Sequence, residues 1–401
     1  MEYSENRLAD YSEDSSIGRG SIDVPFLLLV LLLLTIGVVM VLSASFARAY
    51  YSAATKHNAT YYFTRQLFFA VTGVAIMLLA SRFPINFYRR FSGVLLLFSV
   101  VMLLLVLVGG ERVNGARRWF SIGSITFQPS EIAKIAVILF EAQLICRFKD
   151  KMGTFRYGVL PFAAVAVLII GLLVLEPHLS GSIIIILVTA VMMFIGGTRL
   201  FWFLLGGGAV ALGGVIAINV LEYSSDRISA WLDPFADTSD TGYQIVQSLY
   251  AIGSGGLSGL GLGNGRQKYL YLPEEHNDFI FSVVCEELGF IGATVILILF
   301  ALLIARGFFL AMHCKDRYSF LVCSGVTALL AIQVILNVAV VTNLVPCTGI
   351  SLPFFSYGGT ALWLQLAEMG VILSISRDVP EKKFIKPRGA RARGDKAGAG
   401  A

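Results

Sequence analysis

The chain has 401 residues, of which 56% are hydrophobic and 14% are charged, and its formal net charge is +5. A soluble domain of this size does not tolerate so apolar a composition, so the chain is expected to lie in a lipid bilayer. Apolar segments follow one another from Val24 to about residue 374 and exclude a separate soluble domain.

About ten of these segments are long enough to cross roughly 30 Å of hydrocarbon as α-helices. They predict a single all-α, polytopic membrane domain over residues 24–377. Residues 1–23 are expected to form an N-terminal tail, and the basic residues of 378–401 are typical of a disordered tail attracted to anionic lipids. In chain order the predicted spans are 24–46, 61–81, 92–110, 130–147, 158–176, 180–196, 199–221, 279–305, 318–344 and 357–377.

The placement of lysine and arginine predicts how the spans are oriented. Most basic residues lie in the two tails, at Arg199 and in the connections 82–90, 147–156 and 306–317. The positive-inside rule assigns that side to the cytoplasm, so both termini are expected there. Any chemistry is then expected outside, because the outward-facing connections hold most of the unusual sequence: 47–60, 111–129, 222–278 and 345–356.

The longest outward connection, 222–278, joins the seventh and eighth spans. It is too polar to lie in lipid and too rich in aromatic residues to be a simple linker, so we expect it to fold against the helices. Within it, Gln244–Ile252 is predicted to form a short helix. The glycine-rich run from Gly253 to Gly265 favours a shaped loop close to the membrane over a flexible connector, because it also contains leucines.

Motifs for metal and nucleotide binding are absent from the sequence. The five cysteines form no CxxC pair and show no ligand-like spacing with the four histidines, so neither a zinc site nor a disulfide framework is indicated. The glycines of 253–265 lack the Gly-Lys-Ser/Thr of a P-loop, and ATP-driven transport loses support. We predict no metal-ligating residue and no nucleic-acid partner.

Ionisable residues at the ends of apolar spans are candidate functional groups, because an unpaired charge in the bilayer is unfavourable. Glu131 and Lys134 lie three residues apart on one face of the fourth span, and Ser130 is a candidate cap for its first turn. An equally plausible role for this pair is an ion pair that packs helices. Glu286 and Glu287, in the eighth span, are likewise candidates for a hydrogen-bonded anchor in the bundle.

Asp278 occupies a different position, at the boundary between the outward loop and the eighth span. It follows His276 and Asn277 and precedes a run of apolar residues. A carboxylate at such a boundary can have its pKa raised by partial desolvation or held down by a neighbouring lysine, which suits a general base.

Several strings in the outward connections occur in a fixed order along the chain. They are Asn114 to Phe120, Gln128 to Lys134, Tyr243-Gln244 with Gly261 and Gly263, Leu272 to Phe281 with Glu286 to Gly289, and Pro346 to Gly359. As a set they resemble the SEDS (shape, elongation, division, sporulation) family, which includes FtsW, RodA and SpoVE. The doubled arginine of the first string is more similar to the FtsW or SpoVE branch. One position departs from the family pattern, because His178 stands where an aspartate is usual.

The resemblance implies a ten-helix peptidoglycan glycosyltransferase in the bacterial inner membrane, active in division or in related septal or spore-wall synthesis. Its substrates would be lipid II and a glycan on polyprenyl pyrophosphate, polymerised at the outer face. Its implied partners are a class B penicillin-binding protein, other divisome or elongasome membrane proteins, and membrane lipids. The donor is already activated, so no organic cofactor is expected, although a divalent cation, Mg²⁺ or Mn²⁺, is plausible.

The resemblance also assigns roles to residues. Asp278 matches the catalytic residue of the family motif and is expected to be the general base of an inverting transfer. Arg117, Arg118 and Lys134 are candidates to bind pyrophosphate, since arginine and lysine match its charge. Lys134 has an alternative role as the partner of Asp278, and Glu131 is a candidate to orient Lys134. His276 and Ser356 complete the substrate-binding candidates.

Two other classes of function compete with the enzyme. A lipid II transporter would also use ten helices, buried charges and broken helices, but it predicts charges near the bilayer midplane. The charges here gather at the outer ends of spans, although Glu141 and Glu368 are predicted to lie deeper. A non-catalytic scaffold for the penicillin-binding protein predicts that replacing Asp278 or Arg118 leaves growth unaffected.

Overall fold

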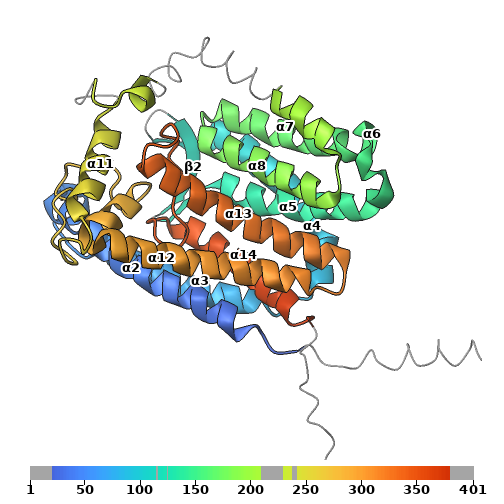
Figure 1. Cartoon of the computed structure of the whole chain (residues 1–401), viewed down its shortest axis with the longest axis horizontal. Coiled ribbons are helices and arrows are strands. Elements are labelled where there is room, and N and C mark those ends of the chain that lie inside the picture. Colours follow the sequence, from blue (N-terminus) through green and yellow to red (C-terminus); the bar gives the residue numbers. More distant parts are fainter. Residues whose placement is uncertain (1–19, 114–115, 124, 209–228, 237–241, 380–401) are drawn as a thin grey trace, which may run out of the picture.

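The computed structural model describes residues 20–113, 116–123, 125–208, 229–236 and 242–379. The long helices run side by side and carry short non-helical segments at one end of the bundle (Figure 1). The helices are α2 (Val24–Tyr51), α3 (Tyr61–Ala80), α4 (Ile85–Gly109), α5 (Pro129–Phe148), α6 (Phe155–Gly158), α7 (Leu160–Leu175), α8 (Leu179–Gly196), α11 (Tyr243–Gly255), α12 (Ile280–Met312), α13 (Arg317–Val341) and α14 (Gly359–Ser376). Residues 200–208 and 229–232 are also helical, and η2 (Ala53–Thr55) and η3 (Lys149–Gly153) are short 3₁₀ turns.

The all-α, polytopic fold predicted from the sequence is confirmed. Every predicted span except the seventh coincides with a helix, and α11 forms where the short helix at Gln244–Ile252 was expected. Within the described residues, 8 helices are long and apolar enough to cross a membrane. The helix α5 is not among them because it carries Glu131, Lys134 and Glu141. Most of the seventh span (199–221) and both predicted tails lie outside the described residues.

A small antiparallel sheet in the connection 111–127 was not predicted. It consists of β1 (Glu111–Val113), β2 (Ala116–Ile122) and β3 (Ile125–Phe127), in that order. Arg112 lies opposite Arg117, and Phe120 lies opposite Phe127. The strands pair their backbone groups with one another, which lets a non-helical connection lie over the end of an apolar bundle.

The two ends of the described chain lie together, at the opposite end of the bundle from α11 and β2 (Figure 1). The backbone N–H of Gly20 donates to the carbonyl of Arg377 over 3.0 Å. The carboxylate of Asp23 caps α2 and also pairs with the Arg306 guanidinium, with 2.5 Å between Nη2 and Oδ2. The two ends of the described chain therefore lie at one end of the helix bundle.

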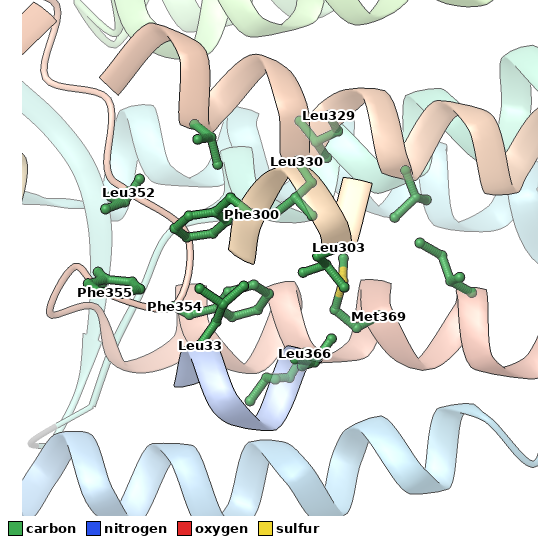
Figure 2. Close-up of a cluster of buried hydrophobic side chains, with 14 of the residues drawn as sticks. Leu33, Phe300, Leu303, Leu329, Leu330, Leu352, Phe354, Phe355, Leu366 and Met369 are labelled. Atoms are coloured by element: carbon green, nitrogen blue, oxygen red, sulfur yellow. The ribbon is translucent and has the colours of Figure 1, made fainter. Parts of the chain in front are cut away.

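The helix α13 is the central element, because it packs against α5, α8, α12 and α14. The non-helical segment before α14 is anchored in the core beside it. Figure 2 shows Phe354 and Phe355 among side chains of α2, α12 and α14. Phe300 on α12 contacts both, with ring centroids 6.4 Å and 5.7 Å apart. The α2 backbone approaches closely at Gly37, where a Cβ would lie 2.3 Å from the Phe354 carbonyl oxygen.

Replacing Phe355 by alanine is expected to destabilise the fold by about 3–5 kcal/mol, because it opens a cavity among fully buried side chains. The free energy of unfolding in detergent measures this loss. Phe98→Ala on α4 is the matched control, because its ring is 47% exposed on the face available to lipid. Equal losses for the two variants would contradict the assigned core.

Candidate active site

A cavity of about 510 Å³ lies at the same end of the bundle as the sheet and α11. The ends of α5, α8, α13 and α14 enclose it together with β2 and the segments that lead into α12 and α14. Its lining is polar although the surrounding helices are apolar, which suits a sugar or phosphate better than an apolar ligand. The polar lining residues include Arg118, Gln128, Ser130, Glu131, Lys134, His178, Ser180, Gln244, Glu274, Asn277, Asp278, Gln333, Thr348, Ser351, Ser356, Tyr357 and Gln365.

The first turn of α5 supplies an ion pair to the cavity wall. Lys134 Nζ lies 2.7 Å from Glu131 Oε2, and their side chains are 5% and 12% exposed. Gln128 is the N-cap residue and Pro129 follows it, so Ser130 does not cap the helix as the sequence predicted. Ser130 lines the cavity instead. The expected pairing of Lys134 with Glu131 is therefore present, and the pair faces the cavity as well as the helices.

The two neighbouring arginines of β2 have different positions. Arg118 lines the cavity, and its Nε donates to the carbonyl of Glu176 over 3.2 Å while its Nη2 donates to the carbonyl of Pro177. Arg117 is not a lining residue, because its Nη1 donates to the carbonyls of Leu107 and Val108 at the end of α4. The structure thus brings Arg118 to Lys134 in one cavity but does not bring Arg117 there.

Asp278 lies on the cavity wall, just before the N-cap residue of α12, Phe279. Its backbone carbonyl accepts a hydrogen bond of 2.8 Å from Asn337 on α13. Across the cavity rim, Gly349 has φ +67°, and a Cβ there would lie 2.9 Å from Asp278 Oδ2. A glycine at this position therefore lets the 345–358 segment lie directly against the carboxylate.

An ion pair holds the segment that carries Asp278. The guanidinium of Arg48 on α2 forms two hydrogen bonds of 2.7 Å to the carboxylate of Glu275, which is fully buried. Burial alone would raise the pKa of Glu275, but the neighbouring His276 and the hydrogen bonds from Arg48 outweigh it and lower that pKa. The carboxylate thus remains ionised, and the segment is fixed three residues before Asp278.

Glu286 and Glu287 anchor the glycine-rich loop, which was one of the two roles expected for them. Glu286 accepts backbone N–H groups of Arg266 and Gln267, the first over 2.7 Å. Glu287 pairs with Lys268 over 2.7 Å, and both side chains are almost completely buried. The predicted shaped loop is therefore present. It is joined to α12 by buried charge-assisted hydrogen bonds, which are stronger than neutral ones.

Two candidates for substrate binding have structural contacts. His276 is 5% exposed and does not line the cavity; its ring packs between those of Tyr62 and Tyr357, with centroid distances of 4.7 Å and 5.8 Å. Ser356 does line the cavity, but its Oγ donates to the carbonyl of Asn277 over 2.9 Å and accepts from the Leu352 N–H over 2.8 Å. Both residues therefore connect the Asp278 segment to the rim.

Sequence reasoning missed most of the amides that line the cavity. Gln333 and Gln365 are almost completely buried on α13 and α14, and Gln128 and Gln244 lie at the starts of α5 and α11. The available signal was an amide within a largely apolar span, as at Gln333. Such a group is unfavourable in the bilayer unless it finds a partner, so it marks a polar interior surface.

Glu176 and His178 form a buried pair of ionisable groups behind Arg118. Glu176 is 1% exposed, and neither carboxylate oxygen has a hydrogen-bond partner among the described residues. Burial raises the pKa of Glu176 to about 8, although the charge of Arg118 opposes the shift. Burial and the charges of Arg118 and Lys134 lower the pKa of His178 to about 3, so this imidazole is neutral at physiological pH. His178 lies on the cavity wall beside Gln128, 3.4 Å from Nε2 to Nε2.

The raised pKa of Glu176 gives a pH-dependent contribution to stability. The folded chain favours the neutral acid, so this contribution is complete below the ordinary pKa of 4.5 and is lost as pH rises through about 8. Glu176→Gln keeps the neutral shape and removes the titration. Its thermal midpoint is therefore expected to exceed that of the wild type increasingly from pH 5 to 8, each unit of pKa shift corresponding to about 1.4 kcal/mol. Parallel pH profiles for the two proteins would refute this assignment.

Comparisons with known proteins show which family the chain is similar to. Residues 24–381 match the sequence profile of the FtsW/RodA/SpoVE family, described as cell cycle proteins. A probable peptidoglycan glycosyltransferase FtsW of Trichlorobacter lovleyi is 42% identical over 357 residues, which cover 88% of this chain and 93% of the relative. Stage V sporulation protein E of Bacillus subtilis is 40% identical and covers 90% of this chain and 98% of its own length.

Solved structures show the same architecture. A chain of a peptidoglycan synthase complex that coordinates polymerization and crosslinking superposes with a TM-score of 0.74 at 30% identity, over 89% of this chain and 98% of that one. The rod shape determining protein RodA of Thermus thermophilus superposes with a TM-score of 0.66 at 29% identity, over 90% and 98% of the two chains. The similarity thus covers almost all of the described fold.

Proposed function

The chain belongs to the FtsW/RodA/SpoVE family and is a membrane-embedded peptidoglycan glycosyltransferase, and we propose that it polymerises lipid II with Asp278 as the general base. One observation carries the proposal: Asp278 shares a polar cavity with the cationic side chains of Arg118 and Lys134. A base and a group that stabilises pyrophosphate are the two functions that this transfer requires.

The reaction joins an acceptor sugar to a donor glycan held on polyprenyl pyrophosphate. The C4 hydroxyl of the acceptor N-acetylglucosamine attacks the anomeric carbon of the donor, and the bond from that carbon to the pyrophosphate oxygen breaks on the opposite face. The anomeric configuration is therefore inverted. The hydroxyl proton passes to the carboxylate of Asp278, and the pyrophosphate leaves with the bonding electron pair.

Arg118 and Lys134 are assigned to the negative charge that develops on the leaving pyrophosphate. Arginine presents a planar set of donors to phosphate oxygens, whereas lysine acts as a point charge. Glu131 holds the ammonium of Lys134 at 2.7 Å and so directs it toward the cavity. The neutral amides of Gln244, Asn277 and Gln333 are suited to hydrogen bonds with the hydroxyl and acetamido groups of the sugars.

A divalent cation is a separate proposal. Mg²⁺ and Mn²⁺ prefer oxygen ligands such as carboxylates, and Glu131, Glu274 and Asp278 line the cavity. Within the described ranges, however, no three His, Cys, Asp or Glu side chains are grouped so that they could hold a metal ion. The residues present thus offer no ready-made site, and no step above is assigned to a cation.

The cavity is proposed to face the outside of the bacterial inner membrane. Arg82 lies between α3 and α4, Arg89 near the start of α4 and Arg306 near the end of α12, so all three belong to the end of the bundle where both described chain ends lie. Their positive charge supports a cytoplasmic location for that end. The cavity lies at the other end, where a lipid head group can enter while its polyprenyl chain stays in hydrocarbon.

A class B penicillin-binding protein is the proposed partner, since a similar chain belongs to a synthase complex that also crosslinks.

Lipid transport is a second candidate function, because transporters carry charged groups deep in the helix bundle and this chain has two buried carboxylates there. Glu141 is fully buried on α5, about two turns beyond Lys134, and accepts a hydrogen bond of 2.8 Å from Thr189 on α8. Glu368 on α14 is 5% exposed. Movement of labelled lipid II across liposomes without glycan synthesis would favour that function.

The base assignment is tested with Asp278→Asn, which keeps the size of the side chain and removes its basicity. Polymerisation of labelled lipid II, with the class B partner present, is expected to fall by about 100- to 10,000-fold. Glycan ladders on gels measure the product. Asp150→Asn, an exposed aspartate in η3 far along the chain from the cavity, is the matched control. Ladders of equal length and amount from both variants would exclude Asp278 as the base.

The role of Lys134 is tested with Lys134→Gln and Lys134→Arg. Loss of the positive charge is expected to lower kcat/KM by about 100- to 1,000-fold, the size of effect found when one transition-state hydrogen-bond donor is removed. Arginine should restore part of the rate, because it keeps the charge. Initial rates over a range of lipid II concentrations give both constants. An unchanged kcat/KM in Lys134→Gln would remove this residue from the pyrophosphate site.

A further inference from the structure

Asn337 is a fully buried amide in the outer half of α13, within a stretch that is otherwise almost entirely apolar. Its side-chain Nδ2 donates to two backbone carbonyls, that of Asp278 over 2.8 Å and that of Ile350 over 2.7 Å. The Oδ1 atom has no hydrogen-bond partner among the described residues. Burying an amide in this way is unfavourable unless its hydrogen bonds serve the structure.

We propose that Asn337 is a positioning residue that sets the place of the Asp278 carboxylate relative to the rim of the cavity. This inference rests on the proposed function, in which Asp278 is the base. Asn337 is not a lining residue of the cavity, so it acts through the two segments that it joins and not on the substrate.

The first of its hydrogen bonds fixes the residue that carries the base. Asp278 precedes the N-cap of α12, and the neighbouring carbonyls of Asn277 and Phe279 accept the backbone N–H groups of Ile280 and Ser282. The carbonyl of Asp278 is bonded to Asn337 instead. This bond defines the peptide plane that follows Asp278, and with it the direction in which the side chain leaves the backbone.

The second hydrogen bond fixes the opposite wall. Ile350 follows Gly349, whose left-handed conformation brings its Cα against the Asp278 carboxylate. One amide nitrogen therefore holds both the residue of the base and the segment that contacts it. Farther from the base, the same two segments are joined by the bond from Ser356 to Asn277 and by the Tyr357 N–H, which donates to the His276 carbonyl over 2.8 Å.

This arrangement predicts an effect on turnover and not on binding. Misplacing a catalytic group by about 1 Å can lower a rate by about 100-fold. The cationic and amide groups that contact substrate remain in place, so KM should change little. Asn337→Leu has a similar volume but lacks the donor, so it leaves the carbonyls of Asp278 and Ile350 without this partner and is expected to lower the thermal midpoint.

The experiment compares Asn337→Leu with Ser324→Ala, a buried control on the same helix that does not line the cavity. Rates of lipid II polymerisation with the class B partner, and thermal midpoints in detergent, are measured for both. We expect Asn337→Leu to lower kcat by about 10- to 100-fold and to leave KM within about twofold. Its thermal midpoint should fall below that of the control, because two buried carbonyls lose their donor, while the protein stays folded at the assay temperature. Asn337→Ser keeps one hydroxyl donor and should give an intermediate kcat.

Two results would overturn the inference: a kcat of Asn337→Leu equal to that of the control, or a loss of kcat accompanied by a change in KM of the same size. If Asn337→Leu does not fold, Asn337→Ser decides by the same criteria. Asp278→Asn is assayed in parallel. If it polymerises lipid II normally, the proposed base is wrong. If it is inactive while Asn337→Leu is normal, only the positioning role fails.

Discussion

Backbone polar groups at membrane depth need partners within the protein, and this constraint determines how the active-site cavity is built. Helices satisfy it by themselves, but the segments around 111–127, 256–279 and 345–358 are not regular helices. The first pairs its strands, the second receives the buried carboxylates of Glu286 and Glu287, and the third is bonded to Asn337 and Ser356. Buried polar side chains thus allow irregular backbone to enclose a polar cavity inside an apolar bundle.

The electrostatic arrangement of the cavity follows from the same architecture. Arg118 and Lys134 approach from β2 and α5, whereas Asp278 approaches from the start of α12. Two carboxylates near the cavity do not line it: Glu275 pairs with Arg48, and burial raises the pKa of Glu176 and so favours its neutral form. Because the cations and the base come from different elements, one set of groups can stabilise the leaving pyrophosphate while another accepts the proton of the attacking hydroxyl.

The sequence was sufficient for the membrane spans, because their apolar runs are long, and for the Glu131–Lys134 pair, because a spacing of three places both on one helix face. It could not separate Arg117 from Arg118. Neighbouring residues of a strand point to opposite faces, so the choice depends on the pairing of β2, which short strands do not reveal. The sequence could not predict the contacts of His276, Ser356 and Asn337 either, because these contacts join segments that are far apart in the chain.

The most direct test of this mechanism is a structure of the Asp278→Asn protein with lipid II bound, determined by electron cryomicroscopy in lipid nanodiscs. We predict that the acceptor C4 hydroxyl lies within hydrogen-bond distance of residue 278 and that a pyrophosphate contacts Arg118 and Lys134. A head group bound outside the cavity, or a pyrophosphate placed beside residue 278 and away from both cations, would contradict the assignment of base and leaving-group sites.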